Sequence, residues 1–284
     1  MNNHLAFSEG NVAVITGAAD GIGLAAAERF AALGMNVLMS DINTDLLEKA
    51  AIAVREIATP LGATVDTRSV NVAEWGAISS LKDHAFETFG HVDVLMNNAG
   101  TSERTGSFSA LDQWRHLVEV NMWGIIHGVQ AFTQPMIDQN RPGLIINTGS
   151  KQGITNPPGN PAYNVSKAGV KAATECLQHE LRNIKDCSIS AHLLVPGYTY
   201  TGLTKRHSPE KPAGAWAPNQ VVDYLLDGVN RGSFYIICPD NEVSSEDDAK
   251  RILWAAGDIA HDRTPLSRWD PDYADAYLSF KPPK

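Results

Sequence analysis

The stretch that decides the fold reads Val12-Ala13-Val14-Ile15-Thr16-Gly17-Ala18-Ala19-Asp20-Gly21-Ile22-Gly23. An apolar run of strand length stops at Thr16-Gly17, and an alanine-rich segment from Gly21 predicts a helix to about Leu33. Glycines in such a turn let the backbone approach a pyrophosphate at the N-terminus of the following helix. A purely structural turn uses the same residues, but the placement between a first strand and a first helix favours a dinucleotide site.

The same alternation of strand and helix continues to about residue 240. Strands are predicted at 12–15, 36–40, 64–70, 92–96, 144–148, 189–195 and 234–238, and helices at 21–33, 44–58, 75–89, 111–138, 161–184 and 218–229. Strands that are apolar on both faces indicate a parallel sheet covered by helices on both sides. The sequence therefore predicts an α/β fold with a doubly wound, Rossmann-like, seven-stranded parallel sheet and a C-terminal extension.

The composition of the chain indicates which kinds of partner and which cellular compartment to expect. The chain has 284 residues, of which 43% are hydrophobic, and this length suits one large core. A net charge of −9 argues against nucleic acid or an anionic membrane as a partner. Three cysteines without close pairing, no leader-like start and no membrane-length apolar run favour a cytoplasmic location. The nine histidines show no metal-ligand spacing, so no metal is expected.

Tyr163 and Lys167 lie one helical turn apart, on the same face of the predicted helix 161–184. A nearby ammonium favours the phenolate and is expected to lower the pKa of the tyrosine. A tyrosine tuned in this way can move a proton to or from an alcohol near neutral pH. Such pairs also occur on solvated helices, so the spacing needs support from the rest of the chain.

Asp41 ends the second predicted strand, where a carboxylate can accept hydrogen bonds from the adenosine ribose. Its charge would repel a 2′-phosphate, so the sequence favours NAD over NADP. Asp20 adds a second negative charge beside the glycine-rich turn. The alternative role for Asp41 is a cap for the following helix, although Asn43 can cap it equally well.

Taken together, these motifs resemble the short-chain dehydrogenase/reductase family over roughly residues 8–240. The matching positions, in the family's order and spacing, are 16–23, Asn97-Asn98-Ala99-Gly100, Asn121, Ser150, Tyr163, Lys167 and Pro196-Gly197. The three residues between Gly17 and Gly21 resemble the single-domain oxidoreductase branch rather than the extended epimerase and dehydratase branch. The resemblance implies one dinucleotide-binding oxidoreductase domain over 1–240, with a substrate loop at about 198–219.

The resemblance also implies roles for four residues of a catalytic set. Tyr163 resembles the acid/base, and Lys167 resembles the residue that lowers its pKa and holds the nicotinamide ribose. Ser150 resembles the hydroxyl that hydrogen-bonds the substrate oxygen. Asn121 resembles the residue that holds a water in the proton relay.

A larger set resembles the family's NAD contacts. The positions are Gly17, Asp20, Gly21, Ile22, Gly23, Asp41, Ile42, Asn71, Val72, Asn98, Ala99, Gly100, Tyr163, Lys167, Pro196, Gly197, Thr199 and Thr201. Within this set Ile22 is expected near the pyrophosphate and Ile42 against adenine. Thr199 and Thr201 are expected at the nicotinamide carboxamide. Asn71 replaces the family's usual aspartate, but its amide can still bond adenine.

The resemblance implies hydride transfer between NAD and a secondary alcohol or ketone, and the candidate pocket residues favour one of moderate size. Gln152 is expected to offer its amide to the substrate, with a surface glutamine as the alternative. Tyr198 and Trp216 are expected in an aromatic pocket wall. Two other functions stay open: a non-catalytic NAD-binding sensor, and a lyase or epimerase that uses the same tyrosine.

The helices predicted at 111–138 and 161–184 are apolar around more than one face. A helix of this kind is buried on both sides, so one side needs a partner beyond the sheet. The resemblance suggests a homodimer or homotetramer that forms through these two helices.

Residues 241–284 follow the last predicted strand and carry several late aromatic side chains. These are Trp254, Trp269, Tyr273, Tyr277 and Phe280. Disordered segments are poor in such residues, and 249–259 shows helical apolar spacing that ends at Ile259. We expect this extension to dock, burying Trp254 and Trp269, on the 198–219 loop of its own domain or at a subunit interface. The alternative is a frayed tail.

Overall fold

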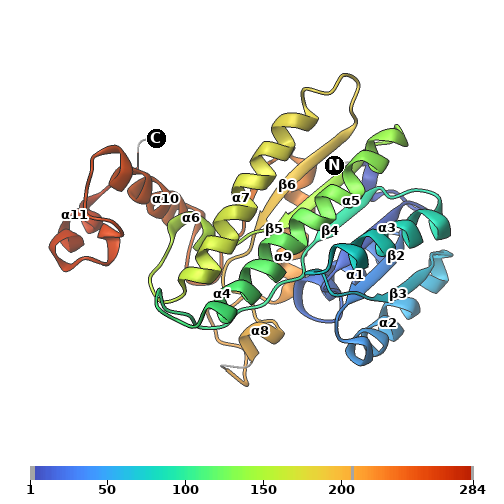
Figure 1. The fold of residues 1–284 in the computed structure, drawn as a ribbon, viewed down its shortest axis with the longest axis horizontal. Coiled ribbons are helices and arrows are strands. Elements are labelled where there is room, and N and C mark those ends of the chain that lie inside the picture. Colours follow the sequence, from blue (N-terminus) through green and yellow to red (C-terminus); the bar gives the residue numbers. More distant parts are fainter. Residues whose placement is uncertain (1–3, 206–207, 283–284) are drawn as a thin grey trace.

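A single seven-stranded sheet forms the centre of the computed structural model, which describes residues 4–205 and 208–282 (Figure 1). The strands are β1 (Val12–Thr16), β2 (Asn36–Asp41), β3 (Val65–Ser69), β4 (Val94–Asn97), β5 (Gly143–Thr148), β6 (Ile189–Val195) and β7 (Tyr235–Ile237). They lie in the order β3-β2-β1-β4-β5-β6-β7, and every neighbouring pair is parallel. This arrangement confirms the predicted fold class.

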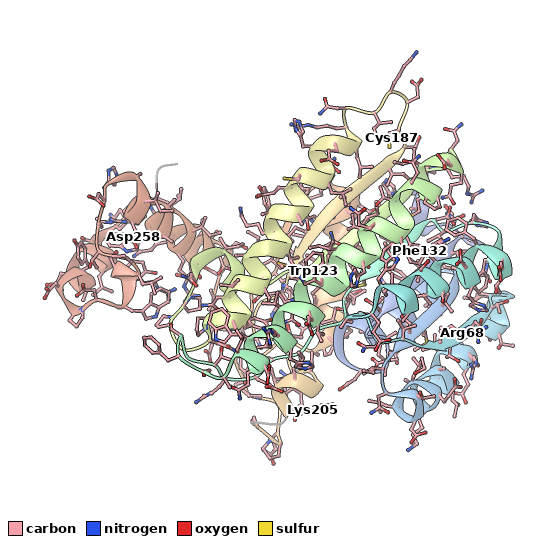
Figure 2. All side chains as sticks on the ribbon, viewed as in Figure 1. Arg68, Trp123, Phe132, Cys187, Lys205 and Asp258 are labelled. Atoms are coloured by element: carbon pink, nitrogen blue, oxygen red, sulfur yellow. The ribbon has the colours of Figure 1, made fainter. Side chains whose placement is uncertain are left out.

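Helices cover both faces of the sheet because its side chains are buried on both sides. One face carries α1 (Gly21–Ala32), α2 (Thr44–Ala58) and α9 (Pro218–Asn230). The other carries α3 (Trp75–Phe89), α5 (Gly124–Asp138) and α7 (Pro161–Leu181). Phe132 of α5 is 1% exposed and lies in the second of these cores (Figure 2). The shorter elements are 3-10 turns at Leu5–Phe7 and Thr59–Leu61, and helices α4 (Leu111–Val118), α6 (Gln152–Thr155) and α8 (Gly202–Lys205).

The order of the strands reverses between β1 and β4. The chain runs outward through β2 and β3, then returns to place β4 on the other side of β1. In open parallel sheets, ligands bind outside the carboxyl ends of the strands at such a switch point. The glycine-rich turn after β1 and the segment after β4 both meet at this place.

The helix predicted as continuous over 111–138 is interrupted. A π-helical turn, Glu119–Trp123, separates α4 from α5, and Asn121 is at its centre. Single π turns inside helices occur frequently at functional sites. The prediction of an unbroken helix was therefore wrong where a candidate site residue lies. The helix predicted to 184 also ends earlier, at Leu181.

The C-terminal extension forms a small helical unit that projects from the sheet and its helices (Figure 1, red). It comprises α10 (Ser245–Ala260), 3-10 turns at Ser267–Trp269 and Pro271–Tyr273, and α11 (Ala274–Ser279). Trp254 is 3% exposed, and the rings of Tyr277 and Phe280 each lie 5.3 Å from its ring centroid. Asp258 accepts a hydrogen bond from Arg263 Nε at 2.9 Å within the same unit (Figure 2).

Only part of the expected docking is observed. Trp254 is buried as predicted, but Trp269 is 39% exposed and Ile259 is 88% exposed. The buried face of α10 is the one that carries Trp254, because the aromatic residues of α11 cover that face. The connection before α10 does meet the 198–219 loop, where Asn241 Nδ2 donates to the carbonyl of Ala213 at 2.7 Å.

Over residues 4–205 and 208–282, no helix is long and apolar enough to cross a membrane. The same residues contain no group of three or more histidine, cysteine, aspartate or glutamate side chains placed to hold a metal ion.

Candidate active site

Tyr163 and Lys167 lie in the first two turns of α7, which begins with Pro161 at a position where a missing N–H costs nothing. Lys167 is 4% exposed, and its ammonium lies 5.9 Å from the centre of the Tyr163 ring. The ammonium donates a hydrogen bond to the carbonyl of Thr148, at the end of β5, at 2.8 Å. This bond holds the lysine at the carboxyl edge of the sheet.

Ser150 follows β5 and faces the same tyrosine. The Ser150 hydroxyl lies close enough to the Tyr163 phenol to act on its pKa. The Ser150 Oγ also accepts a hydrogen bond from the backbone N–H of Gln152 at 3.2 Å, which fixes the turn into α6. The structure therefore brings the predicted hydroxyl pair together.

Asn121 is fully buried, and both the oxygen and the nitrogen of its side-chain amide are hydrogen-bonded. Its Oδ1 accepts from the Thr101 N–H at 2.7 Å, and its Nδ2 donates to the Thr101 carbonyl at 2.9 Å. Nδ2 also lies 3.3 Å from the Oγ of Ser166, the residue before Lys167. The π turn thus connects to both the segment after β4 and α7.

The pKa of Tyr163 differs from the sequence expectation. Burial raises the pKa of its phenol, against the lowering effect of the hydrogen bond from Ser150. Burial also lowers the pKa of Lys167 to about 8. Desolvation disfavours the charged form of each group, and sequence spacing carries no information about it.

The glycine-rich turn between β1 and α1 lies close to the segment after β4. Gly17 has a φ of +67°, and a Cβ there would lie 2.7 Å from the Cα of Ala99. A Cβ at Gly23 would lie 2.1 Å from the Gly17 carbonyl oxygen. Asp20 caps α1 by accepting from the Gly21 N–H at 2.6 Å. The turn therefore has the close backbone approach and exposed helix N-terminus that a pyrophosphate requires.

Asn98 joins the ends of the central strands. Its Nδ2 donates to the carbonyls of Thr16 and Gly17 at 3.1 and 3.3 Å, and its Oδ1 accepts from Thr148 Oγ1 at 3.3 Å. Gly100, two residues on, lies beside Asn121 and Lys167. The predicted cofactor segment and the predicted catalytic residues thus share one edge of the sheet.

Asp41 faces the glycine-rich turn. Its Oδ2 accepts from the Ala19 N–H at 3.2 Å and its Oδ1 accepts from the Asn43 N–H at 2.9 Å. The cap of α2 is Asn43, whose side chain accepts from the Leu46 N–H at 3.1 Å. Capping therefore does not account for Asp41. Ile42 is 68% exposed beside it.

The remaining cofactor candidates have different surroundings. Thr201 lies against Gly21, where an added Cβ would be 3.0 Å from the threonine Cβ. Thr199 is 6% exposed. The amide of Asn71 donates to Glu74 Oε1 at 2.8 Å, so in this state it serves a local turn. Of the other members of the set, Ile22 is the second residue of α1, Val72 lies between β3 and α3, and Pro196-Gly197 follows β6.

The three candidate substrate residues are not equivalent. Gln152 lines a cavity of about 280 Å³ between α6 and the extension. Tyr198 is 42% exposed after β6. The ring of Trp216 meets Tyr224 of α9 edge-on, with centroids 5.9 Å apart, on the α1–α9 side of the sheet.

The sequence analysis missed a buried ion cluster beside Ser150. Lys151 Nζ lies 2.6 Å from Asp248 Oδ2 and 3.6 Å from Asp240 Oδ2. Asp240 Oδ2 also accepts from the Tyr198 N–H at 3.0 Å. These three charged residues, here called the Lys151 cluster, link the site to α10. The available signal was a lysine directly after Ser150 together with an aspartate three residues after the last strand.

These features define an α/β protein with a doubly wound parallel sheet, and residues 11–212 match the short chain dehydrogenase family. The chain is 32% identical over 230 residues to 1-deoxy-11-beta-hydroxypentalenate dehydrogenase of Streptomyces exfoliatus, covering 79% of this chain and 81% of that protein. It is 35% identical over 241 residues to 3-oxoacyl-acyl-carrier-protein reductase FabG of Thermotoga maritima, covering 80% and 94%. A short chain dehydrogenase/reductase of Burkholderia phymatum in complex with NAD superposes with a TM-score of 0.82, at 29% identity, over 93% of this chain and 98% of that one. The chain belongs to the short-chain dehydrogenase/reductase family of oxidoreductases.

Proposed function

We propose that the protein transfers a hydride between NAD and a secondary alcohol or ketone, with Tyr163 as the proton acid/base. The observation that carries this proposal is the convergence of Ser150, Tyr163 and Lys167 at one edge of the sheet. The Ser150 hydroxyl lies beside the Tyr163 phenol, and the Lys167 ammonium lies 5.9 Å from the centre of the Tyr163 ring. A hydroxyl, a phenol and a cation in this arrangement can bind an alcohol oxygen and move its proton.

Bound NAD would supply the hydride acceptor, so the protein has to position the alcohol and manage one proton. In the oxidative direction, Tyr163 Oη takes the proton from the alcohol hydroxyl. Ser150 Oγ donates to the same oxygen and stabilises the charge that develops on it. Asn121 keeps the π turn fixed against Thr101, which holds that side of the site in place.

Because the pKa of Tyr163 is raised, its phenolate needs nearby positive charge to take the proton of the alcohol. Lys167 supplies one charge, and the oxidised nicotinamide ring would supply another close to the phenol. Burial has the opposite effect in the cofactor-free structure, where it raises the pKa of Tyr163. We therefore expect the tyrosine to become a competent base only in the complex with oxidised cofactor.

We also propose that copies of the chain associate through the outer faces of α5 and α7. Trp123, at the end of the π turn, is 46% exposed (Figure 2). Val165 of α7 is 50% exposed. Large apolar side chains that face solvent together favour an interface.

Cofactor choice gives a sharp test of Asp41. Asp41→Ala combined with Ile42→Arg should shift the ratio of kcat/KM for NADP over NAD upward by on the order of 100-fold, because a like-charge clash is replaced by an attraction. Asp45→Ala is the matched control, since it removes an exposed carboxylate from the first turn of α2 and should leave the ratio unchanged. A wild-type preference for NADP would show that the role assigned to Asp41 is wrong.

The function itself is tested with a panel of secondary alcohols and NAD, following the absorbance of reduced nicotinamide. The proposal expects saturable reduction of NAD with at least one alcohol of the panel. Binding of NAD without turnover of any alcohol would favour the sensor instead.

A further inference from the structure

A cavity of about 280 Å³ lies between α6 and the C-terminal extension. We call it the extension cavity. Its walls come from α6, the end of β7, α10 and the turn at 267–269. The lining residues are Lys151, Gln152, Ile154, Thr155, Pro157, Ile237, Asp248, Arg251, Ile252, Arg268 and Trp269.

The charges around the extension cavity do not balance. Three cations line it and Asp248 is the one carboxylate in its wall. That carboxylate is already engaged by Lys151 at 2.6 Å, whereas Arg251 approaches it only to 4.0 Å. Lys151 also has Asp240 at 3.6 Å, so Arg251 can share Asp248 with it. Within the described part of the chain, Arg268 forms no ion pair with a carboxylate, so its guanidinium is the charge that faces the space without a close acid.

The Arg268 guanidinium is held in place without an acid. It lies 4.9 Å from the ring centre of Trp269 and 5.5 Å from that of Tyr277. Burial lowers the pKa of this arginine, which shows that its charge is partly desolvated. A fixed, partly desolvated guanidinium is suited to paired hydrogen bonds with a carboxylate.

Apart from Gln152 and Thr155, the rest of the wall is apolar. Ile154, Pro157, Ile237 and Ile252 supply aliphatic surface, and the Trp269 ring lies beside Arg268. A hydrated inorganic ion would leave this surface uncovered. Pockets with a few fixed polar groups on an apolar wall select small organic molecules.

We propose that the extension cavity binds a small organic anion, a carboxylate carried on a compact apolar or aromatic body, through Arg251 and Arg268. Two residues of the same wall, Lys151 and Gln152, directly follow Ser150 in the chain. Two residues span at most about 7 Å, so the wall of the extension cavity begins close to Ser150. The anion can therefore be the acidic end of the alcohol substrate or a separate small acid. The binding itself does not depend on the proposed hydride transfer.

The test is calorimetric titration of the full, cofactor-free protein with benzoate, and with benzamide as the uncharged match. Benzoate should bind saturably in the millimolar range or tighter, and benzamide at least about tenfold more weakly. Arg268→Gln should weaken benzoate binding by at least about tenfold and leave benzamide unchanged. Lys281→Gln is the control, because it removes an exposed positive charge from the extension outside the cavity and should have little effect.

Arg251→Gln provides a second variant should Arg268→Gln alter the melting temperature. Absence of saturable benzoate binding, equal affinity for benzoate and benzamide, or equal benzoate affinity in wild type and both arginine variants would overturn the proposal.

Steady-state kinetics then identify the source of the anion. The bound anion belongs to the substrate if benzoate competes with the alcohol and if Arg268→Gln raises KM only for alcohols that carry a carboxylate. Non-competitive binding would assign it to a separate acid. Loss of turnover in Tyr163→Phe with intact benzoate binding keeps the two proposals independent.

Discussion

Replacing Tyr163 with phenylalanine is expected to slow alcohol oxidation by roughly two to four orders of magnitude, the range that a positioned acid/base contributes. The phenyl ring keeps the packing of Tyr163 in α7, so folding and NAD affinity should stay close to wild type. The loss should therefore appear in kcat, because the missing group acts on the proton in the transition state rather than in binding. Steady-state kinetics with NAD affinity measured separately checks this expectation.

Tyr235→Phe is the matched control for this substitution. Tyr235 is an exposed tyrosine on the edge strand β7, and its hydroxyl donates a hydrogen bond to Glu175 at 2.5 Å. The substitution removes the same hydroxyl group far from the proposed site, so turnover should stay near wild type. Lys167→Ala should reduce both turnover and NAD affinity, because the ammonium serves the phenol and, by family resemblance, the ribose. Near-wild-type turnover in Tyr163→Phe would remove the proposed mechanism.

The second large effect is expected at the Lys151 cluster. Lys151→Met leaves both Asp240 and Asp248 without their close cation, and the Asp248 side chain is only 7% exposed. Removing one partner of a buried ion pair leaves an uncompensated charge and costs about 3 kcal/mol or more of folding free energy. Urea unfolding should show this loss, and kcat should fall as well, because Lys151 directly follows Ser150 and Asp240 holds the Tyr198 N–H.

The double variant Lys151→Met/Asp248→Leu should recover the part of that loss that comes from Asp248, while Asp240 stays without its cation. Burial raises the pKa of Asp248 despite the neighbouring ammonium, so the cost of desolvation offsets part of the attraction between Lys151 and Asp248. Apolar replacements of such buried pairs are often neutral for stability. Arg115→Met is the control, since its pair with Asp112 is exposed and should contribute less than about 1 kcal/mol. Equal, small losses in Lys151→Met and Arg115→Met would show that the cluster contributes no special stability.

Most of the fold could be predicted because its signals are local. Apolar strands alternate with amphipathic helices, and the glycine-rich turn lies between the first pair, which is sufficient for a doubly wound parallel sheet. The carboxyl ends of such strands meet at one edge, so residues after β1, β4 and β5 were expected to gather there. The structure places Asn98, Ser150 and Tyr163 at that edge.

The features that the sequence did not predict depend on contacts between distant segments. The π turn has the same apolar composition as the helices around it, and it is the amide of Asn121 that connects it to Thr101. The apolar spacing that ends at Ile259 indicated the helix α10, but Ile259 is exposed because Tyr277 and Phe280 pack on the face that carries Trp254. The pKa of Tyr163 depends on desolvation, which follows from the folded surroundings.

Transfer of deuterium from the carbinol carbon of a labelled secondary alcohol is the most direct test of the central claim. The wild-type protein, incubated with NAD and the alcohol that gives the highest rate in the panel, should yield reduced cofactor that carries the label by mass spectrometry. Tyr163→Phe should yield almost none in the same time. Recovery of product with the label retained, or exchanged with water, and with no label in the cofactor would contradict hydride transfer and favour the lyase or epimerase chemistry.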